Sequence, residues 1–315
     1  MHKPGIVALR PLGLGDLYDG AFRAIRHNAG ATVGASVLVA ALAMAIPVLV
    51  TTVLGATGGL ASGLSGDPTD AGSAASTAAA ALAFGSLGLA TLLQGLGTIL
   101  VTAMVARVVG AAVVGRTMTL AEAWAETRGR RWRLLGLAAL LAIGFTLLIG
   151  AYVLAWVLLA FAADLVVLLL FGLVSVPAFL ALLVWLWVRV ALLPATVLSL
   201  ENVSVLGAIA RGRRLTLGHF WRVLGIALLT VVITQVVGGV LSIPVGIVGE
   251  VVLLAVDPSY EVVVLVLSQA VATVVAAAFV TPFMTAVTAL QYVDLRIRQE
   301  AFDVELLART RPAAR

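Results

Sequence analysis

Residue types that commonly carry out catalysis are scarce in this sequence of 315 residues. It has no cysteine, a single lysine (Lys3), and three histidines, His2, His27 and His219, that stand far apart along the chain. A phosphodiesterase would need histidine and clustered carboxylates to hold a metal and transfer protons, and a P-loop would need its own lysine. The string GLSGD around Ser65 lacks the final glycine of a nucleophile elbow. We therefore predict no enzyme, no metal site and no cofactor.

Polar side chains within long apolar stretches are a second candidate for chemistry, because such groups are costly in hydrocarbon and often mark a functional site. They recur at helical spacing in three stretches: Gln94, Thr98 and Thr102; Thr230, Thr234 and Gln235; Gln269 and Thr273. Two interpretations are open. The stripes either join helices by hydrogen bonds, worth about 0.6–2 kcal/mol each, or line a path for a neutral solute or lipid headgroup. We favour the first, because no charged side chain stands among them.

Arginines are the third candidate, and they gather outside the apolar stretches. We predict that the following residues contact lipid headgroups or a protein partner: Arg23, Arg26, Arg128, Arg130, Arg131, Arg133, Arg211, Arg213, Arg214, Trp221 and Arg222. A guanidinium beside an anionic headgroup gains about 1 kcal/mol, so these residues predict a surface for anionic membrane lipid. The alternative is that the arginines only fix the topology of the chain.

The elements that position these residues follow from composition. Hydrophobic residues make up 62% of the chain, charged residues 11%, and the mean hydropathy is +1.15, whereas a soluble domain is about half apolar and a quarter charged. A helix needs about 20 apolar residues to cross a bilayer core. The apolar runs predict six spans, at 29–54, 80–106, 134–162, 165–188, 223–249 and 262–290, with Asp164 capping the fourth.

Charge predicts the orientation of these spans. With six spans, all 20 Lys and Arg residues fall on the side that holds both termini. The other side holds only acidic residues: Asp67, Asp70, Asp164, Glu250, Asp257 and Glu261. Because basic residues stay in the cytoplasm, we expect a bacterial plasma-membrane protein with cytoplasmic N- and C-termini. Residues 1–28 then form an N-terminal amphipathic helix, 29–292 the transmembrane domain and 293–315 a cytoplasmic tail.

A charged amphipathic segment precedes each pair of spans, starting at Gly15, Thr119 and Ser204, which indicates a threefold internal repeat. Asp19 and Arg23 form an i,i+4 pair in the first segment, and Thr119 with Glu122 has the pattern of a capping box in the second. The predicted fold is an all-α integral membrane protein with six transmembrane helices as three hairpins. Each hairpin is preceded by a cytoplasmic interfacial amphipathic helix whose apolar face meets lipid.

Three stretches carry a resemblance to a known family: RPLGLGDLYDGAFRAIRHN at 10–28, LPATVLSLENVSVLGAIARGRRLTLGHFWRVLG at 193–225 and YVDLRIRQEAFDVEL at 292–306. They resemble stretches of actinobacterial polytopic membrane proteins of uncharacterised function. Those proteins are similar to the membrane domain attached to some glycerophosphodiester phosphodiesterases. The resemblance covers the whole chain and implies a membrane domain, but this sequence contains no soluble catalytic region.

The leading hypothesis is a non-enzymatic scaffold or accessory subunit. Its basic cytoplasmic surface would bind anionic membrane lipid and a membrane or cytoplasmic protein partner, and we expect no nucleic acid among its partners. The first alternative is a transporter or lipid-handling protein that uses the Gln/Thr stripes. The second rests on the resemblance alone: a non-catalytic membrane module of a glycerophosphodiester phosphodiesterase pathway.

Overall fold

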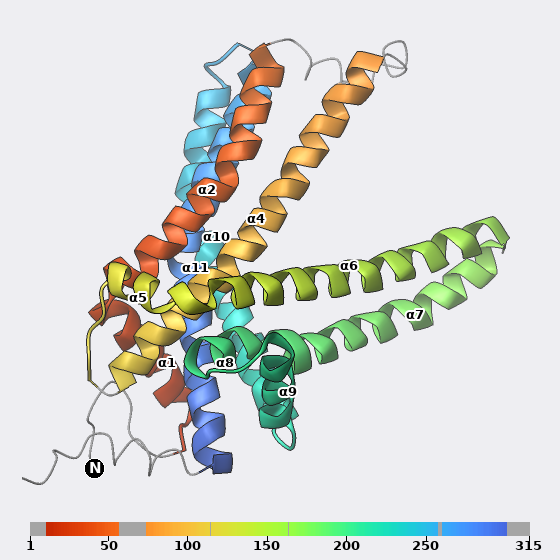
Figure 1. The fold of residues 1–315 in the computed structure, drawn as a ribbon. Helices are drawn as coiled ribbons and strands as arrows, with labels where there is room; N and C mark the ends of the chain where they lie inside the picture. The colour runs from red at the N-terminus through yellow and green to blue at the C-terminus, as the bar shows by residue number, and fades with distance from the viewer. Residues whose placement is uncertain (1–10, 57–73, 114, 163, 258–259, 301–315) are drawn as a thin grey trace, which may run out of the picture.

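The computed structural model describes residues 11–56, 74–113, 115–162, 164–257 and 260–300 (Figure 1), and within these ranges it is helical with no strands. Six of the described helices are long and apolar enough to cross a membrane, as the sequence predicted. They are α2 (Ala29–Ala56), α4 (Ala74–Val113), α6 (Arg131–Ala162), α7 (Leu165–Leu186), α10 (Phe220–Leu253) and α11 (Glu261–Glu300). Their length and apolarity are those of membrane-spanning helices.

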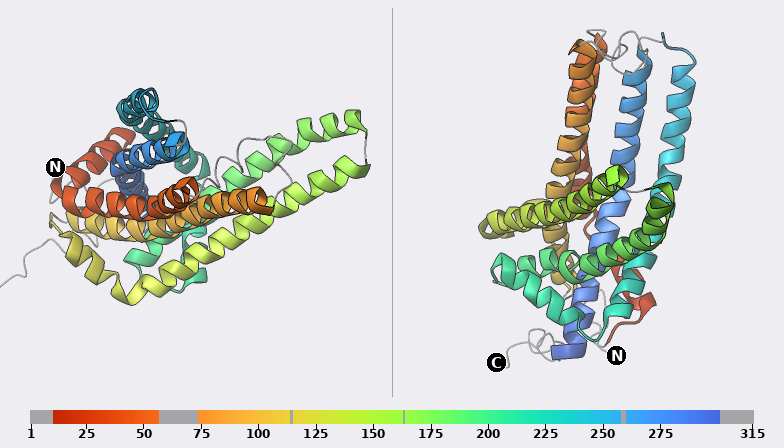
Figure 2. Two further views of the ribbon diagram at one scale, coloured as in Figure 1. Left: turned by 90° about the horizontal axis from the view of Figure 1, so that it is seen from above. Right: turned by 90° about the vertical axis from the view of Figure 1, so that its right-hand side faces the viewer.

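Four of these helices, α2, α4, α10 and α11, pack side by side into a bundle (Figures 1 and 2). Glycines let neighbouring backbones approach closely. A Cβ atom added to Gly97 of α4 would clash with the side chain of Val39 of α2, and one added to Gly238 of α10 would lie 2.9 Å from Val280 Cγ2 of α11. Small residues at such contacts are the usual means by which helices associate in lipid, where no hydrophobic force drives them together.

The other two long helices, α6 and α7, leave the bundle to one side as an arm (Figure 1). Only the start of α6 is buried, at Leu134, Leu137 and Ala138, and α7 has no buried residue. The two helices are joined by Tyr152, whose ring stacks on Phe179 with centroids 3.9 Å apart. The six helices thus do not form one compact bundle. Asp164 occupies the N-cap position of α7 as predicted, but its side chain makes no capping hydrogen bond.

Short helices gather at one end of the bundle, near Leu12 and the end of α11; we call this the basic end. They are α1 (Leu14–His27), α5 (Leu120–Glu126), α8 (Pro194–Leu200) and α9 (Val205–Thr216), with a 3-10 turn η1 (Arg128–Arg130) and a π turn η2 (Trp187–Ala191). Helices α1, α5 and α9 begin within one residue of the three predicted starts. The predicted capping box is confirmed: Glu122 accepts from the Thr119 N–H at 2.8 Å, which lowers the pKa of the Glu122 carboxyl, and Thr119 Oγ1 accepts from the Glu122 N–H.

The apolar face of α1 is covered by protein, in contrast to the predicted contact with lipid. Leu17, Ala21 and Ala24 are completely buried. The ring of Phe22 packs on Phe283 of α11 with centroids 4.9 Å apart, next to the ring of Tyr18. The opposite face of α1 is exposed and carries the expected Asp19–Arg23 ion pair at 3.6 Å. Periodicity therefore identified the buried face of α1 but not what covers it.

Two long helices run further into the basic end than the apolar runs predicted. Helix α4 continues to Val113 and α11 to Glu300, so residues 293–300, which were assigned to the tail, are helical. Asp294, Leu295 and Ile297 are buried there. A helix of 40 residues measures about 60 Å, twice the hydrocarbon thickness of about 30 Å, so the last turns of α11 extend beyond the apolar core.

Candidate functional site

The polar contacts of the basic end centre on Asp294, near the end of α11, which is completely buried. Its Oδ1 accepts hydrogen bonds from the Leu12 backbone N–H at 2.7 Å and from Arg298 Nε at 2.9 Å. Its Oδ2 forms an ion pair with Arg222 Nη2 of α10 at 3.0 Å. The Leu12 carbonyl also accepts from Arg222 at 2.7 Å and from Arg298 at 3.1 Å. One carboxylate thus ties the segment before α1 to α10 and α11.

A second set of ion pairs lies on the α8–α9 side of α11. Glu201, which ends α8, accepts from Arg211 Nε at 3.2 Å and from the Tyr292 hydroxyl at 2.6 Å. Arg211 Nη2 also pairs with Glu300 at 2.6 Å, and Arg296 Nε pairs with the same carboxylate at 2.9 Å. Arg211 of α9 is therefore held between two acids. We call the two sets together the ionic cluster.

The ionic cluster brings together the three stretches that carry the family resemblance. Leu12 belongs to the first stretch, Glu201, Arg211 and Arg222 to the second, and Asp294 to the third. Each acid of the cluster is paired with at least one arginine. Within the described ranges, no group of three or more His, Asp or Glu side chains could hold a metal ion. The contacts of the cluster therefore join the segment before α1 to α9, α10 and α11.

Several of the arginines predicted to contact lipid are held by protein. Arg211 and Arg222 belong to the ionic cluster. Arg130 donates to the Ser199 carbonyl, and Arg133 donates to Asn202 Oδ1 at 3.0 Å. These arginines join η1 and α6 to the segment around α8, and their guanidinium groups are occupied by protein acceptors.

Other predicted contact residues do face outward. Arg26 of α1, Arg128 of η1, and Arg213 and Arg214 of α9 are exposed, and none makes an ion pair with the part of the chain that the structure describes. Trp221 is 80% exposed at the start of α10. Exposed cations therefore lie on three separate short elements of the basic end.

The threonines of the polar stripes bond mainly within their own helices. They donate to carbonyls of those helices, for example Thr98 to Gln94 at 2.7 Å and Thr273 to Gln269 at 2.8 Å, and the same holds for Thr102, Thr230 and Thr234. One hydroxyl also joins helices: Thr230 Oγ1 lies 3.2 Å from the Tyr18 hydroxyl of α1. Gln235 and Gln269 are exposed on the outside of α10 and α11. Gln94 is partly buried, and its Oε1 has no partner among the described residues.

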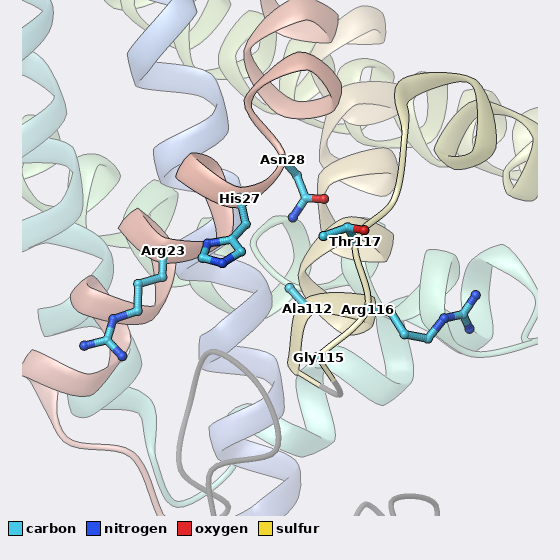
Figure 3. Close-up of a pocket in the computed structure, with 7 residues that line it drawn as sticks. All are labelled: Arg23, His27, Asn28, Ala112, Gly115, Arg116 and Thr117. Atoms are coloured by element: carbon cyan, nitrogen blue, oxygen red, sulfur yellow. The ribbon is translucent and has the colours of Figure 1, made fainter.

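A pocket of about 290 Å³ opens between the end of α1 and the segment that follows α4 (Figure 3). Its lining includes two arginines, Arg23 and Arg116, whose guanidinium groups point away from the pocket on opposite sides. Asn28 at its edge has a structural role, since its Oδ1 accepts from the Met118 N–H at 3.0 Å. The pocket does not direct its cations at one anion.

Comparison with known proteins gives no family assignment. No protein-family model, no curated protein and no solved structure matches the chain. The function proposed below therefore depends on the residues and contacts of this chain alone.

Proposed function

We propose that this chain is a non-enzymatic scaffold or accessory subunit of the bacterial plasma membrane whose basic, cytoplasmic face binds anionic lipid headgroups. The observation that supports the proposal is a set of exposed arginines that pair with no carboxylate in the described ranges, all at the end where α1, α5 and α9 lie: Arg26, Arg128, Arg213 and Arg214. A free guanidinium near an anionic surface gains about 1 kcal/mol. An arginine already paired with an acid has little left to gain.

The order of the elements supports a threefold design. Each short helix, α1, α5 and α9, is followed by two long ones: α2 and α4, α6 and α7, α10 and α11. We propose that these units are three transmembrane hairpins and that α5 and α9 lie in the membrane interface. Exposed apolar residues on them, Trp124 and Leu206, fit that position. The arm adds an apolar surface that lipid or the helices of another membrane protein would cover.

Transport is less well supported than scaffolding. The threonines of the stripes satisfy carbonyls of their own helices, which is the usual arrangement of hydroxyls in apolar helices. Gln235 and Gln269 lie on the outer surface, and no described cavity is lined by them together with Gln94.

The orientation is testable with single cysteines, because the natural chain has none. We expect a membrane-impermeant maleimide to label Ser65→Cys in intact spheroplasts and to leave Arg128→Cys and Arg213→Cys unlabelled. Inside-out vesicles should give the reverse pattern. Labelling of Arg213→Cys in intact spheroplasts would show that the basic end faces outward and would overturn the proposal.

Lipid preference tests the role of the free arginines. We expect spin-labelled phosphatidylglycerol to associate with the reconstituted protein several-fold more strongly than phosphatidylcholine. Replacing Arg26, Arg213 and Arg214 by glutamine should remove most of this preference, whereas replacing the same three by lysine should keep it. Equal association of the two lipids with the wild-type protein would contradict the proposal, and so would an unchanged preference in the glutamine variant.

A further inference from the structure

An apolar groove of about 790 Å³ follows the seam between α2 and α4. Leu38 and Leu42 of α2 line one wall, and Leu96 and Leu100 of α4 line the other. The groove is open along its side, and its volume lies within the range of about 300–1,000 Å³ that is typical of sites for small ligands. Along the bundle it is bounded toward the basic end by α5 and by Leu135 at the start of α6.

The length of the groove matches one leaflet of a bilayer. Its wall on α4 runs from Leu93 to Met104, which is about 16 Å of helix at roughly 1.5 Å per residue. Half of a hydrocarbon core of about 30 Å is about 15 Å. An acyl chain that enters from the basic end would therefore fill the groove over the depth of its own leaflet.

The end of the groove at α5 carries an arginine that pairs with no carboxylate of the described ranges. Trp124 lines this end, and the guanidinium of Arg131 lies 3.7 Å from the centroid of its indole ring. Arg131 donates to the Trp124 carbonyl at 2.6 Å but pairs with no carboxylate in the described part of the chain, and its Nε has no acceptor there. Exposed Arg128 lies three positions before Arg131, in η1. Glu126, the last residue of α5, is paired with Arg107 at 3.1 Å.

We propose that this groove is a specific lipid site that holds one acyl chain of an anionic glycerophospholipid, with the lipid phosphate beside Arg131 and Arg128. Apolar walls as long as one leaflet suit the acyl chain, and guanidinium groups that pair with no described carboxylate suit the phosphate at their end. The inference rests on the proposed lipid-binding role and adds a defined position and a stoichiometry of one.

Native mass spectrometry of the detergent-solubilised protein titrated with phosphatidylglycerol tests the site. We expect one tightly retained lipid. Ala121→Phe, which places a ring in the groove from an exposed position of α5, should weaken its retention at least tenfold. Ala125→Phe, on the same helix but outside the groove lining, should bind as the wild type does. Arg131→Gln should weaken binding about fivefold, the equivalent of about 1 kcal/mol, and Arg213→Gln should not.

Three results would overturn the inference: equal retention by the two phenylalanine variants, equal binding of phosphatidylcholine, or equal binding of neutral diacylglycerol. A second measurement avoids any effect of substitution on folding. Phosphatidylglycerol with a photoreactive group near the end of one chain should crosslink wild-type protein at Leu42 or Leu93, and adducts confined to the arm would contradict the site. The two proposals can fail separately. If one lipid is retained but the variant at Arg26, Arg213 and Arg214 keeps the wild-type lipid preference, the groove site is supported and lipid binding by the exposed arginines is contradicted. If no lipid is retained but that variant loses the preference, only the groove site is contradicted.

Discussion

Replacing Asp294 by asparagine removes the negative charge from the middle of the ionic cluster and leaves the shape of the side chain nearly unchanged. The Asp294 side chain is 1% exposed, and its partners Arg222 and Arg298 are 32% and 27% exposed. The asparagine side chain has one acceptor oxygen in place of the two carboxylate oxygens, and its NH2 group would face one of the arginine donors. Loss of one partner from a buried ion pair costs about 3–5 kcal/mol. Because water can still reach both arginines, we expect the lower end, a loss of about 3 kcal/mol in the free energy of unfolding.

Reversible unfolding in mixed detergent micelles, with sodium dodecyl sulfate as the denaturant and circular dichroism as the signal, measures this loss. The double variant with Arg222→Gln should lose less than the sum of the single losses, with a coupling of about 1–3 kcal/mol. The matched control is Asp19→Asn, which breaks the exposed pair with Arg23 and should cost less than about 1 kcal/mol. A loss below about 1 kcal/mol for Asp294→Asn, or additive losses in the double variant, would refute the view that this carboxylate holds the basic end together.

Three further substitutions can be followed by the same unfolding measurement. Gly97→Ala should lower the free energy of unfolding by about 1–3 kcal/mol, because the added methyl group meets Val39. A second substitution, Val39→Ala, should recover part of this loss, and no recovery would contradict the contact. Gln94→Leu should leave stability unchanged or raise it by up to about 1 kcal/mol, since it removes a buried oxygen with no partner in the described chain; a large loss would reveal an unrecognised bond. Tyr292→Phe should cost about 1.5–3 kcal/mol because Glu201 loses a short hydrogen bond, and an unchanged midpoint would argue against that bond.

The features that the sequence predicted correctly are local ones. The six long helices follow from the length and apolarity of their segments, and the capping box of Thr119 and Glu122 follows from two residues three positions apart. Helix ends were less predictable. Helix α11 continues to Glu300 because Asp294 and its apolar neighbours are covered by other elements, and this covering is a property of the tertiary structure.

The candidate site was only half predictable for the same reason. Arginine content identified the basic end, but no spacing in the sequence pairs Asp294 with Arg222, which lies 72 positions away, or Glu201 with Tyr292, which lies 91 positions away. One signal was present in the sequence: an aspartate four positions after the end of the last apolar run and four residues before Arg298. An acid in that position needs a cation when the helix continues into a packed region.

Topology and lipid binding make different demands on the arginines of this chain. The positive-inside rule counts every basic residue near a span, so a paired arginine and a free one contribute alike. Attraction to an anionic surface depends on charge that remains uncompensated after folding. The two properties fall on different arginines: Arg211 and Arg222 join helices through acids of the ionic cluster, while Arg26, Arg213 and Arg214 are exposed. Neutralising Arg211 and Arg222 should therefore lower the free energy of unfolding and leave the lipid preference largely unchanged. Neutralising Arg26, Arg213 and Arg214 should lower the lipid preference and leave the free energy of unfolding largely unchanged.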